Sequence, residues 1–186
     1  MSLSVCVFCG SPFGDDPRYR VAAQEAGREI ARRGWTLVYG GAHVGLMGVV
    51  ADAALAEGGR VVGVIPRFLF EREIAHDRLS ALEVVDSLTE RKLRMGALSD
   101  AFLSLPGGVG TLDELFEAWS WSQVGLQNKP CGLLNVAGYY DALLAFLDRA
   151  TAAGFMKPEH RRLLAAAVDV GELLEGFAAF GAAPSR

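Results

Sequence analysis

Short, continuous apolar segments alternate with amphipathic segments along almost the whole chain, and this alternation restricts the possible folds most strongly. Between the short segments apolar residues recur at helical spacing, for example over 17–33, where Gly34 follows as the expected residue after the helix. Strands that are apolar on both faces are typical of a parallel sheet covered by helices on both sides. The sequence therefore predicts an α/β fold, a Rossmann-like doubly wound parallel β-sheet.

The expected elements follow this alternation. Strands are expected at 3–8, 35–39, 60–65, 82–85, 101–105 and 131–134. Helices are expected at 17–33, 46–57, 88–98, 112–124, 139–153, 158–166 and 171–177, with an irregular stretch at 66–80. The residues Ser87-Leu88-Thr89-Glu90 form a capping box at the start of the third helix. Ligands of such sheets bind beyond the carboxyl ends of the strands, which locates the expected site.

Length and composition favour one folded domain. The chain has 186 residues, of which 51% are hydrophobic, and its net charge is only -4. A chain of this length buries roughly 70% of the surface that its unfolded form exposes, which is enough for a core without disulfides. The sequence shows no internal repeat and no linker, so we expect a single domain over 1–186 with frayed residues at 182–186.

The same features exclude several classes of partner. An acidic chain with a pI of about 5.4 is a poor candidate for binding a nucleic acid polymer. No apolar stretch reaches the ~18 residues needed to span a bilayer, so no membrane partner is expected. The first residues lack the basic region of a secretory signal, and the chain has only three cysteines. We therefore expect a cytoplasmic protein with reduced thiols.

The cysteines and histidines raise the question of a redox motif and of a zinc site. Cys6 and Cys9 form a C-x-x-C pattern, but a redox motif of this kind opens a helix, whereas Cys6 lies inside an apolar strand-like run. We interpret these cysteines as buried core residues. The histidines His43, His76 and His160 are scattered without the spacing of zinc ligands, so no metal is expected.

Three junctions between an expected strand and the next helix are rich in glycine. They are the segments 10–14, 40–45 and 106–111. Glycine lets the backbone approach a ligand closely, and the following helix dipole favours an anion. Three such junctions along one edge of one sheet indicate a phosphate or nucleotide site. The chain has no G-K-[ST] and no G-x-G-x-x-G, which disfavours a nucleoside triphosphatase and a dinucleotide-dependent dehydrogenase.

The helix expected after the third junction carries a carboxylate, Glu114, near its start. Thr111-Leu112-Asp113-Glu114 reads as a second capping box, with Thr111 at the N-cap and Glu114 three residues later. A carboxylate in the first turn of that helix also lies at the mouth of the expected site, so capping and catalysis are compatible. Arg91 and Lys92 offer a cationic pair on an earlier helix, and with Arg94 they also read as a solvated basic face.

These segments resemble the Lonely Guy family. Pro106 to Glu114 match its P-G-G-x-G-T-x-x-E motif, and Glu90-Arg91-Lys92-x-x-Met95 match its second motif. The segments 40–48, 9–11, 64–66 and 135–140 also fit, so the resemblance runs over about 5–174. Members of this family are cytokinin riboside 5′-monophosphate phosphoribohydrolases, often mislabelled lysine decarboxylases. The resemblance implies hydrolysis of the N-glycosidic bond of a nucleoside 5′-monophosphate, without a cofactor, to a free base and ribose 5-phosphate.

The family pattern also implies site residues. It makes Arg91 and Glu114 the catalytic pair. The implied substrate contacts are Gly10, Ser11, Gly40, Gly41, Met47, Glu73, Arg91, Lys92, Gly107, Gly108, Val109, Gly110, Thr111, Leu112, Asp113 and Ser120. The sequence departs from the usual pattern at Ala42, Thr89, Asp113 and Ser120. Family members dimerise through the region of the helix at 112–124, so the resemblance also implies a homodimer.

Two alternatives remain open at this point. A nucleotide or molybdenum-cofactor carrier on the same fold, as in related proteins, would explain the glycine-rich junctions without using Arg91 and Glu114. A pyridoxal-phosphate decarboxylase would need a Schiff-base lysine, and only Lys92, Lys129 and Lys157 are available. No residues around these lysines resemble a pyridoxal site.

Overall fold

The computed structural model describes residues 2–72 and 74–182 and contains one seven-stranded sheet with the strand order β4-β3-β2-β1-β5-β6-β7. The strands are β1 (Ser4–Phe8), β2 (Thr36–Tyr39), β3 (Arg60–Pro66), β4 (Ala81–Val85), β5 (Ala101–Ser104), β6 (Cys131–Leu134) and β7 (Leu164–Ala167). All neighbouring strands pair in parallel; Val5 of β1, for example, is in register with Leu37 of β2 and Ala101 of β5. This confirms the predicted doubly wound parallel sheet.

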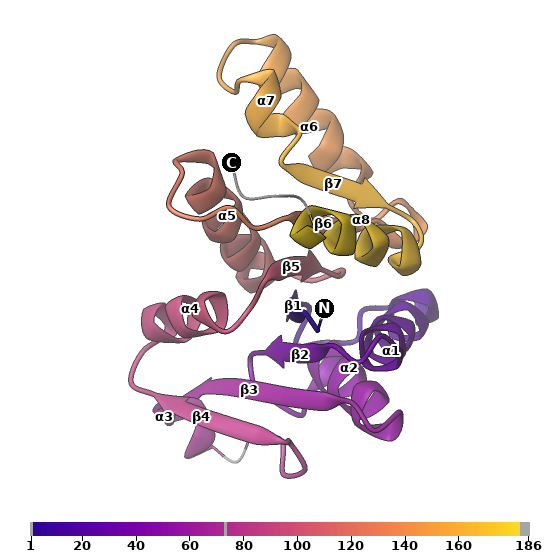
Figure 1. The fold of residues 1–186 in the computed structure, drawn as a ribbon, viewed down its shortest axis with the longest axis vertical. Helices are drawn as coiled ribbons and strands as arrows, with labels where there is room; N and C mark the ends of the chain where they lie inside the picture. The colour runs from indigo at the N-terminus through magenta and orange to yellow at the C-terminus, as the bar shows by residue number, and fades with distance from the viewer. Residues whose placement is uncertain (1, 73, 183–186) are drawn as a thin grey trace.

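Helices cover both faces of the sheet (Figure 1). The helices are α1 (Pro17–Arg32), α2 (Gly45–Ala56), α3 (Arg67–Phe70), α4 (Leu88–Ala97), α5 (Val109–Gln123), α6 (Asp141–Ala152), α7 (Pro158–Arg161) and α8 (Val170–Ala182), with a short 3-10 turn η1 (Val136–Gly138). The helices α1, α2 and α8 lie on one face, whereas α4, α5 and α6 lie on the other.

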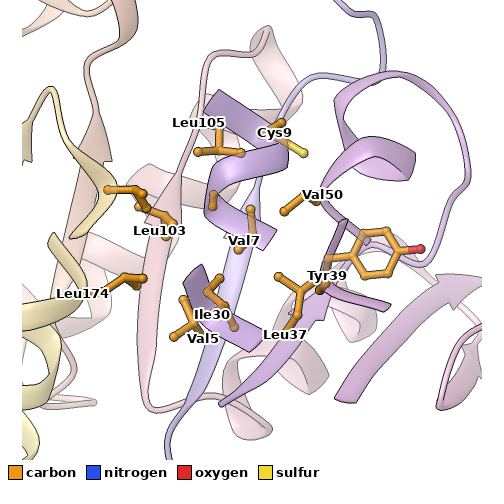
Figure 2. Close-up of a cluster of buried hydrophobic side chains, with 14 of the residues drawn as sticks. Val5, Val7, Cys9, Ile30, Leu37, Tyr39, Val50, Leu103, Leu105 and Leu174 are labelled. Carbon is orange, nitrogen blue, oxygen red and sulfur yellow. The ribbon is translucent and has the colours of Figure 1, made fainter. Parts of the chain in front are cut away.

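Alternate residues of each strand point into two different cores. Val5, Val7 and Cys9 pack with residues of α1, α2 and α8, such as Ile30, Val50 and Leu174, as Figure 2 shows. Cys6 and Phe8 point to the opposite face, where they pack with residues of α4 and α5. Because side chains alternate along a strand, a strand buried on both faces must be apolar at every position. This is why the strands read as continuous apolar runs.

Most expected elements are confirmed to within two residues at each end. Gly34 follows α1 with a φ of 68°, as expected for the residue after a helix. The expected short strand at 82–85 is β4, at the edge of the sheet. Ser87 caps α4 by accepting a hydrogen bond from the Glu90 N–H, but the Glu90 carboxylate bonds the Asp86 N–H rather than that of Ser87.

Two expectations about the elements were wrong. The helix expected at 158–166 is only α7, and 164–167 form strand β7, because pairing with β6 outweighs the helix propensity of an alanine-rich segment. The irregular stretch at 66–80 contains the short helix α3. The turn η1 lies just before the helix expected at 139–153, which is α6. Ala182, the first of the residues expected to fray, is the last residue of α8, and 183–186 lie outside the described residues.

Cys6 and Cys9 are free and buried, which confirms their interpretation as core residues, and Cys131 is free and buried as well. Within the described ranges, no helix combines the length and apolar character required to cross a bilayer.

Candidate active site

Three glycine-rich loops meet at the carboxyl ends of β1, β2 and β5, which are adjacent strands. Gly10 links them, because its N–H donates to the Pro106 carbonyl at 3.0 Å and its carbonyl accepts from the Leu46 N–H at 3.1 Å. The expectation that the loops share one edge of the sheet is therefore confirmed. A single residue holds all three together through backbone hydrogen bonds.

Close packing between the loops explains two of the glycines. Gly45 has a φ of 54°, and a Cβ there would overlap the Ser11 carbonyl. A Cβ at Gly107 would overlap Thr111 and lie 2.8 Å from the Gly10 nitrogen. Any larger residue at these two positions would push the loops apart.

A cavity of about 240 Å³ opens among these loops. Nine of the residues implied by the family pattern line it, namely Gly10, Ser11, Gly40, Met47, Arg91, Gly108, Gly110, Thr111 and Glu114. Three lining residues, Val7, Cys9 and Pro12, were not among the expected contacts, although Pro12 belongs to the first glycine-rich junction. Val7 and Cys9 could have been found from their position near the carboxyl end of β1. Burial raises the pKa of the Cys9 thiol, which keeps this thiol protonated.

Arg91 of α4 and Glu114 of α5 form an ion pair in the cavity, with Arg91 Nη2 2.7 Å from Glu114 Oε1. Their side chains are only 15% and 10% exposed. Burial raises the pKa of the Glu114 carboxyl, and the positive charge of Arg91 opposes this rise. The site thus holds a desolvated carboxylate whose proton affinity is increased and whose position is fixed by a cation.

The guanidinium of Arg91 also borders the second glycine-rich loop. A Cβ at Gly40 would meet the end of Met47 and would lie 3.4 Å from Arg91 Nη1. Arg91 Nε is buried and has no hydrogen-bond partner among the described residues. A buried donor without a partner is costly, so this donor adds to the cost of burying the Arg91 side chain.

The start of α5 corrects the expectation of a second capping box. Gly108 is the N-cap of α5, so Thr111 lies within the first turn and Glu114 within the second. Glycine has no capping side chain, and an N-cap glycine gives little sequence signal. The first four N–H groups of a helix have no carbonyl partner within the helix. Here they belong to residues 108–111, three of which line the cavity, so this helix end is suited to bind an anion.

Lys92 and Asp113 do not line the cavity but pair with each other, with Lys92 Nζ 2.9 Å from Asp113 Oδ2. Lys92 Nζ also lies 3.1 Å from Glu117 Oε2. Burial lowers the pKa of Lys92, but the hydrogen bonds to the two carboxylates outweigh this effect and raise the pKa overall. This second cluster joins α4 to α5 directly beside Arg91 and Glu114, whereas Arg94, expected on the same basic face, pairs with Glu83.

The remaining expected contacts lie outside this cavity. Gly41 accepts a hydrogen bond from the His76 N–H, and Gly107 lines a neighbouring apolar pocket of about 180 Å³. Val109 is exposed, Leu112 packs against the core, and the Ser120 hydroxyl donates to the Glu117 carbonyl. Glu73, also expected as a contact, lies outside the described residues.

Comparison with known proteins identifies the relatives of this chain. A family model described as "Possible lysine decarboxylase" matches residues 47–177. A probable cytokinin riboside 5′-monophosphate phosphoribohydrolase of Oryza sativa subsp. japonica is 51% identical over 91% of this chain and 75% of its own length. A cytokinin riboside 5′-monophosphate phosphoribohydrolase of Arabidopsis thaliana is 45% identical over 92% of this chain and 80% of its own length.

Solved structures share the fold at lower identity. The molybdenum cofactor carrier protein of Chlamydomonas reinhardtii superposes with a TM-score of 0.73, at 20% identity, over 98% of this chain and 100% of that one. A molybdenum cofactor binding protein of Rippkaea orientalis gives a TM-score of 0.74 at 22% identity, over 96% and 97%. Identities this low establish the common fold alone. Both the family match and the close relatives lead to one conclusion: the chain belongs to the Lonely Guy family, whose family model is described as possible lysine decarboxylases.

Proposed function

We propose that this protein hydrolyses the N-glycosidic bond of a nucleoside 5′-monophosphate and releases the free base and ribose 5-phosphate. The observation that carries the proposal is the buried Arg91–Glu114 pair, which lies in the same cavity as the N-terminus of α5. Relatives 45% and 51% identical to this chain are named as phosphoribohydrolases, which supports the same reaction. The three glycine-rich loops that meet at one edge of the sheet support a phosphorylated ligand.

The N-terminus of α5 binds the 5′-phosphate in this proposal. The N–H groups of residues 108–111 donate to its oxygens, and the helix dipole adds a favourable field. The phosphate does not react. Its binding energy instead holds the ribose so that C1′ lies beside the catalytic pair.

Glu114 acts on the bond that breaks. As the base departs with the electron pair of the C1′–N bond, the ribose ring gains positive charge, which a neighbouring carboxylate stabilises. The same carboxylate accepts a proton from the water whose oxygen attacks C1′. The departing base takes up one proton from solvent and Glu114 releases its proton to solvent, so one water molecule is consumed for each bond broken.

Arg91 holds Glu114 in place at 2.7 Å and provides further donors toward the substrate. Its Nη1, which lies toward Gly40 at the cavity, is a donor that a ribose or base oxygen or nitrogen can satisfy. In this proposal Met47 and Gly40 border the base side of the cavity, which Arg91 also lines.

The experiment that tests the proposal is chromatography of free base released from AMP and from isopentenyladenosine 5′-monophosphate under identical conditions. Release from either substrate supports the phosphoribohydrolase, and the ratio of the two kcat/KM values identifies the preferred base. Binding of both nucleotides without release of base by the folded protein would contradict the proposal and favour a carrier. The desolvated carboxylate held by a cation favours catalysis over carriage, and the similarity to the carrier proteins supports a common fold alone.

A pyridoxal-phosphate decarboxylase finds little support in the lysines. Lys92 is held between Asp113 and Glu117, and the Lys129 ammonium donates to the Gly96 carbonyl at 2.8 Å. Neither lies free beside the cavity. Treatment with pyridoxal phosphate and borohydride, followed by mass analysis, is expected to give no labelled lysine in the site.

The protein acts as a homodimer in this proposal, in the reducing environment of the cytoplasm that its three free cysteines suit. Leu93 of α4 and Val124 after α5 are 56% and 66% exposed, and Phe116 between them is 37% exposed. A second copy that covers this α4–α5 surface would bury these side chains. Light scattering is expected to give a dimer for the wild type and a monomer for Leu93→Glu combined with Val124→Glu. Phe155→Glu, at an exposed position after α6, is the matched control and is expected to remain dimeric.

A further inference from the structure

A tyrosine outside the reaction cavity holds the loop that begins α5. The Tyr139 hydroxyl donates to the Gly107 carbonyl at 2.7 Å, and the neighbouring Tyr140 hydroxyl donates to the Leu105 carbonyl at 2.7 Å. The carbonyl between them, of Pro106, accepts from the Gly10 N–H at 3.0 Å. Three consecutive carbonyls of this loop are therefore each held by a separate donor.

The hydrogen bond from Tyr139 determines the direction of an N–H group. The carbonyl of Gly107 and the N–H of Gly108 belong to one planar trans peptide unit, so they point in opposite directions. Fixing the Gly107 carbonyl toward Tyr139 thus directs the Gly108 N–H away from Tyr139. Gly108 is the N-cap of α5 and lines the reaction cavity.

Tyr139 is itself held firmly. Its ring lies edge-to-face between Tyr19 and Tyr140, with ring centroids 5.5 and 4.9 Å away. The turn before it is fixed by Asn135, whose Oδ1 accepts from the Tyr140 N–H and whose Nδ2 donates to Asp141 Oδ1. Ala137 in this turn has a φ of 54°, a conformation that is unfavourable for alanine. Such backbone strain persists where surrounding contacts over-determine the conformation.

We infer that Tyr139 is a positioning residue for the phosphate of the substrate. It orients the Gly107–Gly108 peptide so that the Gly108 N–H is a preorganised donor to a phosphate oxygen. The inference rests on the proposed function for the identity of the ligand. It adds a residue that does not line the reaction cavity and comes from the opposite side of the loop.

The test compares Tyr139→Phe with Tyr19→Phe. Both variants remove one hydroxyl from the same aromatic group, but no hydrogen bond of the Tyr19 hydroxyl is found among the described residues. Titration calorimetry measures the binding of ribose 5-phosphate, which carries the phosphate, and of adenosine, which lacks it. Loss of one oriented hydrogen bond is expected to weaken binding of ribose 5-phosphate to Tyr139→Phe by about 5- to 10-fold. Binding of adenosine is expected to stay within about twofold, and Tyr19→Phe is expected to bind both as the wild type does.

A purely structural role would weaken the binding of both ligands together, or lower Tm without selectivity, and would overturn the inference. Unchanged affinity of Tyr139→Phe for ribose 5-phosphate would overturn it equally. These results are distinct from failure of the proposed function, which is seen as absence of base release by the wild type. If the wild type binds ribose 5-phosphate but releases no base, the comparison of the two variants still decides the role of Tyr139.

Discussion

Replacing Glu114 by glutamine removes one negative charge from the cavity and keeps the size of the side chain. At an effective dielectric constant of about 20, a carboxylate about 4 Å from a developing positive charge contributes about 4 kcal/mol. This corresponds to roughly 10³-fold in rate. The adjacent Arg91 cation, 2.7 Å from the carboxylate, offsets part of this field. We therefore expect Glu114→Gln to lower kcat for AMP by about 10²- to 10³-fold.

The fold is expected to survive this replacement. Burial raises the pKa of Glu114 in the folded protein, so near neutral pH the ionised carboxylate is less favourable in the folded than in the unfolded chain. The stability that this group contributes is lost as pH rises from the unfolded pKa through the folded one. The glutamine variant carries no such charge, and its amide oxygen can still accept from Arg91. Its Tm at neutral pH is expected to stay close to that of the wild type, because removal of the desolvated charge offsets the loss of the ion pair with Arg91.

The assay is base release from AMP, measured by chromatography, with Tm measured on the same samples. Glu117→Gln is the matched control, because Glu117 lies three residues further along α5, pairs with Lys92 and does not line the cavity. Its turnover is expected to stay within about threefold of the wild type. Turnover of Glu114→Gln close to that of the wild type would remove Glu114 from the mechanism. A similar loss in both variants would show that the rate depends on helix packing rather than on the carboxylate in the cavity.

Three further outcomes follow from the site. Burial raises the pKa of Glu114 above the ordinary glutamate value of 4.5, so the acid limb of the kcat/KM profile is expected above pH 4.5. The limb is expected to be absent from the residual activity of Glu114→Gln. An acid limb of the wild type below pH 4.5 would contradict this assignment. Gly107→Ala is expected to lower Tm by about 5 °C because its Cβ overlaps Thr111, whereas Gly110→Ala, whose Cβ meets no neighbour, is expected to leave Tm unchanged in a thermal melt. Adenosine is expected to be cleaved with a kcat/KM at least ~100-fold below that of AMP, measured in a progress-curve assay. Equal values for the two substrates would show that binding of the phosphate does not contribute to catalysis.

The strands show how much of the fold is readable from sequence. The run at 131–134 was predicted to the residue, because a strand buried on both faces is apolar at every position. Strand β7 was missed because Leu164–Ala167 has only one buried position, at Leu164, and its alanines favour a helix. What decides its conformation is pairing with β6, a contact that no local pattern records.

The site, like the fold, was predictable where topology decides it and was not predictable where contacts distant in sequence decide it. The glycine-rich loops could be placed at one edge of the sheet from topology alone, since carboxyl ends of parallel strands lie together. The start of α5 was placed too late because Gly108 carries no capping side chain. The contact between Arg91 and Glu114 spans 23 residues and two helices, so it came from the family resemblance rather than from spacing. The pairing of Lys92 with Asp113 and Glu117 has no sequence signal, and both Lys92 and Asp113 were expected at the ligand instead.

The pairing of β1 with β5 has a consequence for how the chain acquires its site during synthesis. Val5 of β1 pairs with Ala101 of β5, so the central strand of the sheet cannot form this pairing until β5 is translated almost a hundred residues later. Until then only β1 to β4 and their helices are available, and the first glycine-rich loop lacks the Pro106 carbonyl that accepts from the Gly10 N–H. The later half of the chain supplies the N-terminus of α5, the Glu114 carboxylate and the Pro106 carbonyl that accepts from Gly10. A ribosome-bound nascent chain that ends before β5 therefore carries half of a sheet and no cavity, and the protein becomes competent only when both halves have emerged.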